Sequence, residues 1–254
     1  MGDQRKLEGS VALVTGSSRG LGLVFAEGLA REGARVVLNG RNEQTLAQAV
    51  NRLRDKGFDA HAECFSIQDP DAVASAVERV ENEIGPIRIL VNNAGMQQRA
   101  PLEEFPLDGW ENVLGTNLTG AFVVSQAVAR KMIPRQSGRI INILSLQAEL
   151  GRSTIAPYAA SKGGLKMLTR AMCVEWAQHN IQINAIGPGY FETEMTRSLR
   201  ENEAFDTWIR GRTPAGRWGD PEELIPALLL FATPGAEFIN GQIIYVDGGV
   251  TAAI

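Results

Sequence analysis

Short runs of β-branched and apolar residues alternate with longer segments of helical spacing along most of the chain. Six apolar runs predict buried strands, at residues 11–14, 35–38, 89–91, 139–143, 182–186 and 243–246. A weaker run at residues 60–65 predicts a seventh strand. Between the runs, apolar residues recur at helical intervals over residues 21–31, 43–56, 71–84, 110–132 and 158–178. A later helix is expected from Pro221, because Asp220 can cap it.

This alternation predicts an α/β fold made of right-handed βαβ units, with a doubly wound parallel sheet of about seven strands and helices on both faces. The 254 residues are enough for one large domain and few for two, so one domain over residues 1–254 is expected. Ligands of such sheets bind beyond the carboxyl ends of the strands. The loops that follow strands are therefore the places to look for a site.

Composition narrows the function classes. The net charge of -4 argues against a nucleic-acid-binding protein, which usually needs a basic face. The N-terminal ten residues are polar and charged, unlike a signal peptide, and the apolar run Leu228–Ala232 is too short to cross a bilayer. Cys64 and Cys173 are expected to be thiols in a reducing compartment. We expect a cytoplasmic protein with no membrane partner and no metal site.

A glycine-rich turn follows the first predicted strand, in Thr15-Gly-Ser-Ser-Arg-Gly-Leu-Gly22. Glycine permits a tight turn and lets backbone amides approach a pyrophosphate. The helix that begins there adds free N–H groups and a positive dipole end for the same anion. The position of the turn in the first βαβ unit predicts a dinucleotide site that includes Gly16, Ser18, Arg19, Gly20, Leu21 and Gly22.

The end of the second strand predicts which dinucleotide is bound. Enzymes that use NAD place an acidic residue there to bind the ribose 2′-hydroxyl. This chain has Asn39-Gly-Arg41 instead, so no carboxylate repels a 2′-phosphate. Arg41 can pair with that phosphate through charge-assisted hydrogen bonds, and Arg19 can approach it from the glycine loop. We therefore expect NADP as the cofactor, with Asn39 and Arg41 in its site.

A second motif, Tyr158-Ala-Ala-Ser-Lys162, places a phenol and an ammonium on one face of a helix. A fixed cation is expected to lower the pKa of the phenol, which can then exchange a proton with a substrate hydroxyl or carbonyl. Ser145 lies just beyond a predicted strand, where its hydroxyl can bond the reacting oxygen. Asn117 falls inside a predicted helix and needs hydrogen-bond partners if it is buried.

These residues resemble the short-chain dehydrogenase/reductase family, along almost the full chain. The glycine turn, Asn92-Asn-Ala-Gly95, Ser145 and the Tyr-x-x-x-Lys pair carry the resemblance. It implies a Rossmann-type fold and hydride transfer at a nicotinamide. Tyr158 would then be the proton donor or acceptor, and Lys162 would bind the nicotinamide ribose and lower the pKa of the tyrosine. Ser145 would orient the substrate oxygen, and Asn117 would hold a water in a proton relay.

The resemblance also enlarges the expected cofactor site. The residues it adds are Asn93, Ala94, Gly95, Pro188, Gly189 and Thr193. One departure is visible at Ser66, where the family often has an Asp near the adenine; a serine can still hydrogen-bond an amino group. The family commonly forms tetramers through its two long central helices and its C-terminal strand region, so a homotetramer is implied here.

The loops expected beside the catalytic residues are polar, and they resemble those of family members that act on sugar acids. A sugar acid carries a carboxylate and several hydroxyls, so its site needs a cation and hydrogen-bonding groups. Arg99 and Arg152 are the candidates for the carboxylate. Gln147 and Glu149 are the candidates for the hydroxyls, beside Ser145 and Tyr158, which face the reacting oxygen.

Alternatives to this interpretation stay open. A reductase of 3-oxoacyl thioesters from the same family would need an elongated apolar groove, and the polar loop after Ser145 argues against it. A protein that senses NADP without turnover is a second alternative, and the four catalytic positions argue against it. Arg152 can instead pair with Glu149, and Arg99 can instead be a solvated surface residue.

Overall fold

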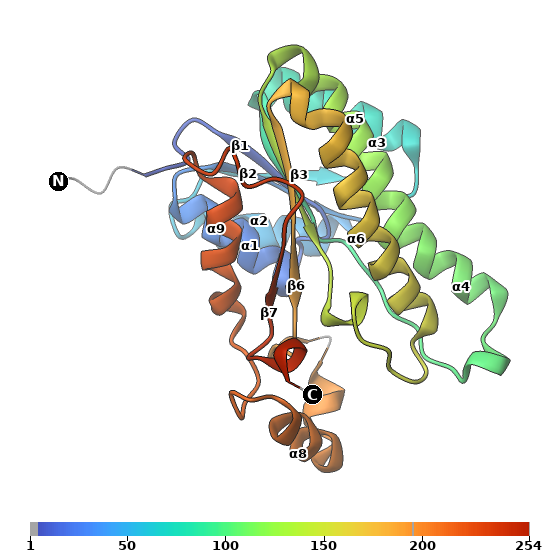
Figure 1. Ribbon diagram of the computed structural model, residues 1–254. Helices are drawn as coiled ribbons and strands as arrows, with labels where there is room; N and C mark the ends of the chain where they lie inside the picture. Colours follow the sequence, from blue (N-terminus) through green and yellow to red (C-terminus); the bar gives the residue numbers. More distant parts are fainter. Residues whose placement is uncertain (1–4, 195, 254) are drawn as a thin grey trace.

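Seven parallel strands form one sheet through the centre of the molecule, in the order β3-β2-β1-β4-β5-β6-β7 (Figure 1). This computed structural model describes residues 5–194 and 196–253. The strands are β1 (Val11–Val14), β2 (Arg35–Gly40), β3 (Ala60–Cys64), β4 (Ile87–Asn92), β5 (Gly138–Ile143), β6 (Ile181–Pro188) and β7 (Ile243–Val246). The chain winds outward from β1 to β3 and then returns to pair β4 with β1, so the switch point of the sheet lies between β1 and β4. The predicted doubly wound α/β sheet is confirmed.

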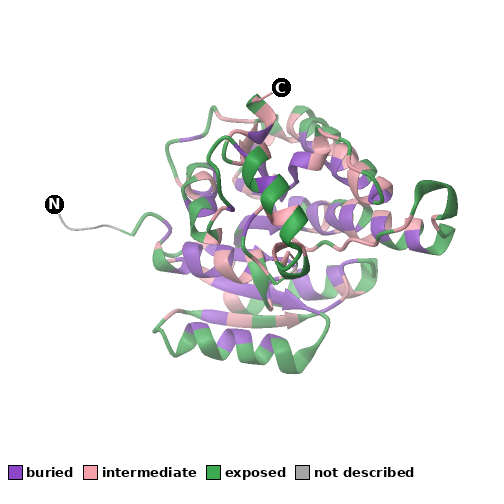
Figure 2. Cartoon of the chain, turned by 90° about the horizontal axis from the view of Figure 1, so that it is seen from below, coloured by how far each residue is buried: buried purple, intermediate pink, exposed green. Residues whose placement is uncertain are grey.

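Helices cover both faces of the sheet. One face carries α1 (Gly20–Arg31), α2 (Glu43–Arg54) and α9 (Ile225–Ala232), and the other carries α3 (Pro70–Arg79), α5 (Ala121–Arg135) and α6 (Ala156–Trp176) (Figure 1). The remaining helices are α4 (Leu107–Leu114), α7 (Arg197–Arg200) and α8 (Glu203–Arg212). Buried residues concentrate on the strands and on the inward faces of these helices (Figure 2).

The apolar runs are continuous because both faces of the strands are covered. In β1, Val11 and Leu13 pack into the core beneath α3 and α5, while Ala12 and Val14 pack into the core beneath α1 and α9. The helices instead bury one stripe each. In α2, the buried apolar side chains recur at intervals of three and four residues, and the Asn42 side chain accepts the Thr45 N–H at the helix start.

The long helix predicted over residues 110–132 is interrupted. The structure has α4, then a π-helical turn η3 (Gly115–Gly120), then α5. Gly115 and Gly120 are poor helix formers, and between them the Asn117 side chain bonds to groups outside the helix. The predicted start signal at Asp220 is present as a capping box with Glu223, although the first turn is the 3-10 segment η6 (Pro221–Leu224).

The loops that follow β1, β4, β5 and β6 gather at one end of the sheet, where α8 also lies at the foot of Figure 1. Neither α7 nor α8 was predicted from the spacing of apolar residues. Within residues 5–194 and 196–253, no helix combines the length and apolarity that a membrane span requires. The same residues contain no cluster of three His, Cys, Asp or Glu side chains suited to a metal ion.

Candidate active site

The glycine turn after β1 packs directly against the loop after β4. Gly16 has a φ of +60°, and a Cβ built on it would lie 2.7 Å from the Cα of Ala94. A Cβ on Gly22, in the first turn of α1, would lie 2.4 Å from Nδ2 of Asn93. Neither position has room for a side chain. The close approach brings the N-terminus of α1 to the switch point, and its N-cap, Arg19, makes no side-chain capping bond. The amides at that end therefore remain available to an anion.

Two side-chain amides hold the strand ends together. Asn39, at the end of β2, accepts the Gly16 N–H through Oδ1 at 3.2 Å. Its Nδ2 donates to the carbonyls of Glu63 at 3.2 Å and Phe65 at 3.0 Å. Asn93 donates through Nδ2 to the carbonyls of Thr15 and Gly16, at 3.0 Å each. Asn39 therefore lines the site as part of its wall, with its amide committed to the fold.

The Asn39 contacts also explain the absence of an acidic residue at this position. A carboxylate has no N–H to donate, so an Asp there would point an oxygen at the two carbonyls. The fold itself thus disfavours an acidic residue at the end of β2.

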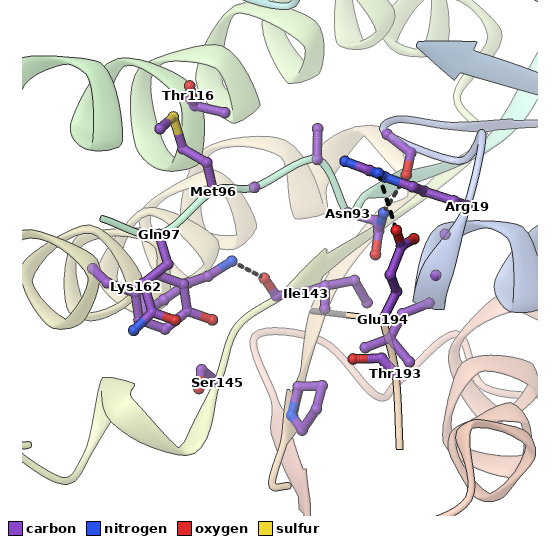
Figure 3. A pocket seen from close by; sticks show the side chains of 18 of the residues that line it. Arg19, Asn93, Met96, Gln97, Thr116, Ile143, Ser145, Lys162, Thr193 and Glu194 are labelled. Atoms are coloured by element: carbon purple, nitrogen blue, oxygen red, sulfur yellow. Dashed lines mark hydrogen bonds and ion pairs between the residues drawn. The ribbon is translucent and has the colours of Figure 1, made fainter. Parts of the chain in front are cut away.

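A cavity of about 550 Å³ runs from this wall to the end of β5. Every residue predicted for the cofactor lines it: Gly16, Ser18, Arg19, Gly20, Leu21, Gly22, Asn39, Arg41, Ser66, Asn93, Ala94, Gly95, Tyr158, Lys162, Pro188, Gly189 and Thr193. Glycine amides, a free helix N-terminus and two arginines suit a phosphorylated dinucleotide. Arg19 reaches across the cavity to Glu194, with 3.5 Å between Nη1 and Oε1 (Figure 3).

Tyr158 and Lys162 lie one turn apart at the start of α6, facing the cavity beside Ser145. Lys162 is buried, and its Nζ donates to the carbonyl of Ile143 at the end of β5, at 2.7 Å (Figure 3). The same Nζ lies 5.7 Å from the centroid of the Tyr158 ring. Burial lowers the pKa of Lys162 from its ordinary 10.5 to about 8.

The expected lowering of the Tyr158 pKa is not what this arrangement gives. Burial raises the pKa of Tyr158, and the neighbouring Ser145 hydroxyl, which acts in the opposite direction, only offsets part of that rise. The physical reason is that the site desolvates both members of the pair. Desolvation therefore outweighs any effect of the Lys162 charge, and the predicted direction of the net shift in the Tyr158 pKa is wrong for the protein alone.

Ser145 is hydrogen-bonded to Gln147 in addition to lying beside Tyr158. Its Oγ donates to Oε1 of Gln147 at 2.5 Å, and it also caps the short 3-10 segment η4 (Leu146–Ala148) by accepting the Gln147 N–H. The Gln147 N–H uses one of the two lone pairs of Ser145 Oγ, which leaves the other for a hydroxyl in the cavity.

Asn117 is buried in the π-helical turn and does not line the cavity. Its Nδ2 donates to the Met96 carbonyl at 2.9 Å and to the Ser161 hydroxyl at 3.0 Å, and its Oδ1 accepts the Met96 N–H at 2.8 Å. Both amide protons are thus used. The side chain clamps the loop after β4 to α6, and a relay water remains a prediction.

Two arginines that line the cavity lie near each other. Burial and the charge of Arg152 together lower the pKa of Arg99. Arg152 donates through Nη1 to the Tyr190 hydroxyl at 3.2 Å, and its guanidinium lies 4.6 Å from the centroid of the Phe205 ring. Among the described residues, neither arginine has a carboxylate within ion-pair distance. Arg99, Arg152 and Gln147, all predicted, line the cavity.

Glu149, which was also predicted for the substrate, does not line the cavity. Its carboxylate accepts hydrogen bonds from Lys166 and, at 2.7 Å, from the Tyr245 hydroxyl, and these bonds hold the pKa of Glu149 below its usual value. The side chain is outside the cavity lining. The prediction that it binds substrate hydroxyls is therefore not supported by its position, and neither is a pairing with Arg152.

Tyr190 is a cavity residue that the motifs of the sequence do not predict. It follows Pro188 and Gly189 after β6 and lines the cavity. Its position in a loop directly after a strand was the available signal. The partner ring of Phe205 comes from α8, which the apolar spacing did not reveal.

A sequence model of the short chain dehydrogenase family matches residues 10–204. This chain belongs to that family. Within the family it is 50% identical over 254 residues to the 5-keto-D-gluconate 5-reductase of Escherichia coli strain K12, with 100% of each chain covered. It is also 50% identical to a gluconate 5-dehydrogenase from Burkholderia cenocepacia J2315, whose crystal structure in complex with NADP and tartrate superposes with a TM-score of 0.96 over 99% of each chain.

Similarity to another branch of this short-chain dehydrogenase family is lower. A 3-oxoacyl-[acyl-carrier-protein] reductase of Vibrio cholerae serotype O1 is 36% identical over 244 residues, which are 96% of this chain and 98% of that one. The family resemblance predicted from the motifs is confirmed.

The buried Lys162 makes the stability of the protein depend on pH. With a pKa of about 8 in the folded state and 10.5 unfolded, the unfolded chain binds one more proton between these values. Stability contributed at this site therefore rises as the pH increases from 8 to 10.5. In Lys162→Met that contribution should disappear, so the free energy of unfolding, measured in urea, should rise less over this window than in the wild type. Lys6→Met, at an exposed position, is the control; identical pH profiles for wild type and Lys162→Met would contradict the assignment.

Proposed function

We propose that the protein catalyses the reversible, NADP-dependent interconversion of D-gluconate and 5-keto-D-gluconate. The observation that carries this proposal is the layout of the cavity. Tyr158 and Ser145 line it together with two arginines that have no carboxylate partner among the described residues. A small substrate with both a carboxylate and a hydroxyl matches these two pairs of residues. The names of the two relatives that are 50% identical support the same substrate pair.

In the oxidative direction, Tyr158 as phenolate takes the proton of the C5 hydroxyl while a hydride leaves C5 and the carbonyl forms. NADP, when bound in its oxidised form, supplies the acceptor for that hydride. Ser145 and Gln147 orient the reacting oxygen, and the Lys162 charge lies where it favours phenolate over phenol. In reduction, Tyr158 returns the proton to the forming alkoxide.

The choice of NADP over NAD rests on Asn39, Arg41 and Arg19. Arg41 is exposed at the cavity wall, where it can pair with a 2′-phosphate. Binding of that phosphate would also compete with Glu194 for Arg19.

We infer further that residues 1–254 work as one NADP-binding catalytic domain and that copies assemble into a homotetramer in the cytoplasm. Support for assembly comes from exposed apolar side chains on the two long helices, at Phe122 of α5 and at Met167 and Val174 of α6. Cys64 and Cys173 are free thiols, which suits a reducing compartment.

The alternatives of the sequence analysis are less supported. A 3-oxoacyl thioester reductase would need an apolar groove, yet the substrate end holds Arg99, Arg152 and Gln147. A protein that senses NADP without turnover would have no use for a desolvated Tyr158 and Lys162 pair beside Ser145.

Tyr158→Phe tests the proposed reaction. Wild-type protein with D-gluconate and NADP⁺ should give reduced nicotinamide, followed by absorbance, and the rate should rise with pH because the raised pKa of Tyr158 keeps phenolate scarce at neutral pH. Tyr158→Phe should bind NADP⁺ as the wild type does and lose at least about 100-fold in kcat. Substantial turnover in the variant, or wild-type activity confined to acyl thioesters, would refute the proposal.

Arg41→Ala tests the cofactor preference. Loss of charge-assisted hydrogen bonds to the 2′-phosphate should raise the KM for NADP⁺ by about 10- to 100-fold and leave the KM for NAD⁺ unchanged. The matched control is Arg52→Ala, an exposed arginine on α2 outside the cavity lining, which should match the wild type. Equal effects on the KM values of both cofactors would show that Arg41 does not bind the 2′-phosphate.

A further inference from the structure

The Tyr190 ring is fixed in place between two segments. Its backbone carbonyl accepts the Gly219 N–H at 2.9 Å, and the preceding Gly189 donates its N–H to the Val246 carbonyl at 2.9 Å. The ring packs edge-on against Trp218, with centroids 5.6 Å apart, and against Phe205 of α8, with centroids 5.7 Å apart. The hydroxyl of Tyr190 is therefore presented to the cavity from a rigid ring.

Among the described residues, the Tyr190 hydroxyl accepts hydrogen bonds but donates none. It accepts from Nη1 of Arg152 at 3.2 Å and from Nε2 of Gln147 at 3.5 Å. A phenol has a single proton to donate, and among the described residues no protein group accepts it. Two donors on its oxygen leave the Tyr190 O–H as a donor toward whatever occupies the cavity.

The same hydroxyl joins Arg152 to the hydrogen bonds of Ser145. Ser145 donates to Gln147, and Gln147 and Arg152 both donate to Tyr190. Arg152 is in turn seated on the Phe205 ring, and its charge acts on Arg99. A carboxylate placed beside Arg152 would thus meet cations and the Tyr190 O–H together, and its charge would relieve the repulsion between the two arginines.

We propose that Tyr190 is a specificity-determining residue, which donates a hydrogen bond to the substrate carboxylate beside Arg152 and so selects acids over neutral polyols. The inference rests on the proposed function, because it takes a sugar acid as the occupant. It assigns the carboxylate three partners, of which only the two arginines are visible in the motifs of the sequence.

Tyr190→Phe tests the inference, because it removes the hydroxyl and keeps the ring that packs on Phe205 and Trp218. With Tyr158→Phe present in both proteins to prevent turnover, calorimetric titration of D-gluconate into NADP⁺-saturated protein should show a dissociation constant raised by about 10-fold or more by Tyr190→Phe, as expected for a lost hydrogen bond to a charged group. The dissociation constant of NADP⁺ itself should stay within about twofold of the wild type.

Kinetic measurements distinguish a role of Tyr190 in selecting acids from a role in maintaining the structure. The ratio of kcat/KM for D-gluconate to that for D-glucitol, in which a CH₂OH replaces the carboxylate, should fall by about 10-fold in Tyr190→Phe. An equal loss for both substrates, or an unchanged affinity for D-gluconate, would overturn the inference. Tyr245→Phe is the matched control, because it removes a phenolic hydroxyl outside the cavity and should leave that ratio unchanged.

Failure of the proposed substrate is distinguishable from failure of this inference. If the wild type neither binds nor oxidises D-gluconate, the proposed function fails, and L-tartrate then serves as a carboxylate probe in the same titration. Weaker L-tartrate binding to Tyr190→Phe than to the wild type, by about fivefold or more, supports Tyr190 as a carboxylate donor. Equal affinities overturn that role.

Discussion

The close approach of two loops at the carboxyl end of the sheet is the constraint on which the site depends. The turn after β1 meets the Ala94 backbone at Gly16 and the Asn93 side chain at Gly22, and neither position has room for a Cβ. Buried strand ends also need hydrogen-bond partners, and the amides of Asn39 and Asn93 supply them. Because these contacts fix the N-terminus of α1 against the switch point, they create the anion-binding end of the cavity.

Among the described residues, the cationic side chains at the rest of the site lack anionic partners, which bound ligands would supply. Lys162 is desolvated, and Arg99 and Arg152 lie near each other without a carboxylate partner among the described residues. Each feature weakens the protein alone, since burial and like charges disfavour the cationic forms. An anionic cofactor at one end and an acid substrate at the other would offset both. Under the proposed function, the site would thus bind two anions, and Tyr158 would exchange a proton with the second of them.

Features that depend on periodicity or on a local motif could be predicted from the sequence. All seven strands, the glycine turn, and the Tyr158 and Lys162 pair follow from spacing within one element and are found within a few residues of their expected places. The π-helical turn at Asn117 was missed because it depends on contacts with Met96 and α6, far along the chain. Tyr190 was missed as a ligand because its hydroxyl acquires its partners only through folding. The raised pKa of Tyr158 likewise depends on burial, which the four-residue spacing does not report.

The most direct test of the account is a crystal structure of the wild-type protein with NADP⁺ and D-gluconate, read for the orientation of the sugar acid. We expect the carboxylate to lie between Arg99 and Arg152, within hydrogen-bond distance of the Tyr190 hydroxyl, and the C5 oxygen to lie within hydrogen-bond distance of Tyr158. A gluconate bound with its carboxylate at Tyr158, or with both arginines turned to solvent, would contradict it.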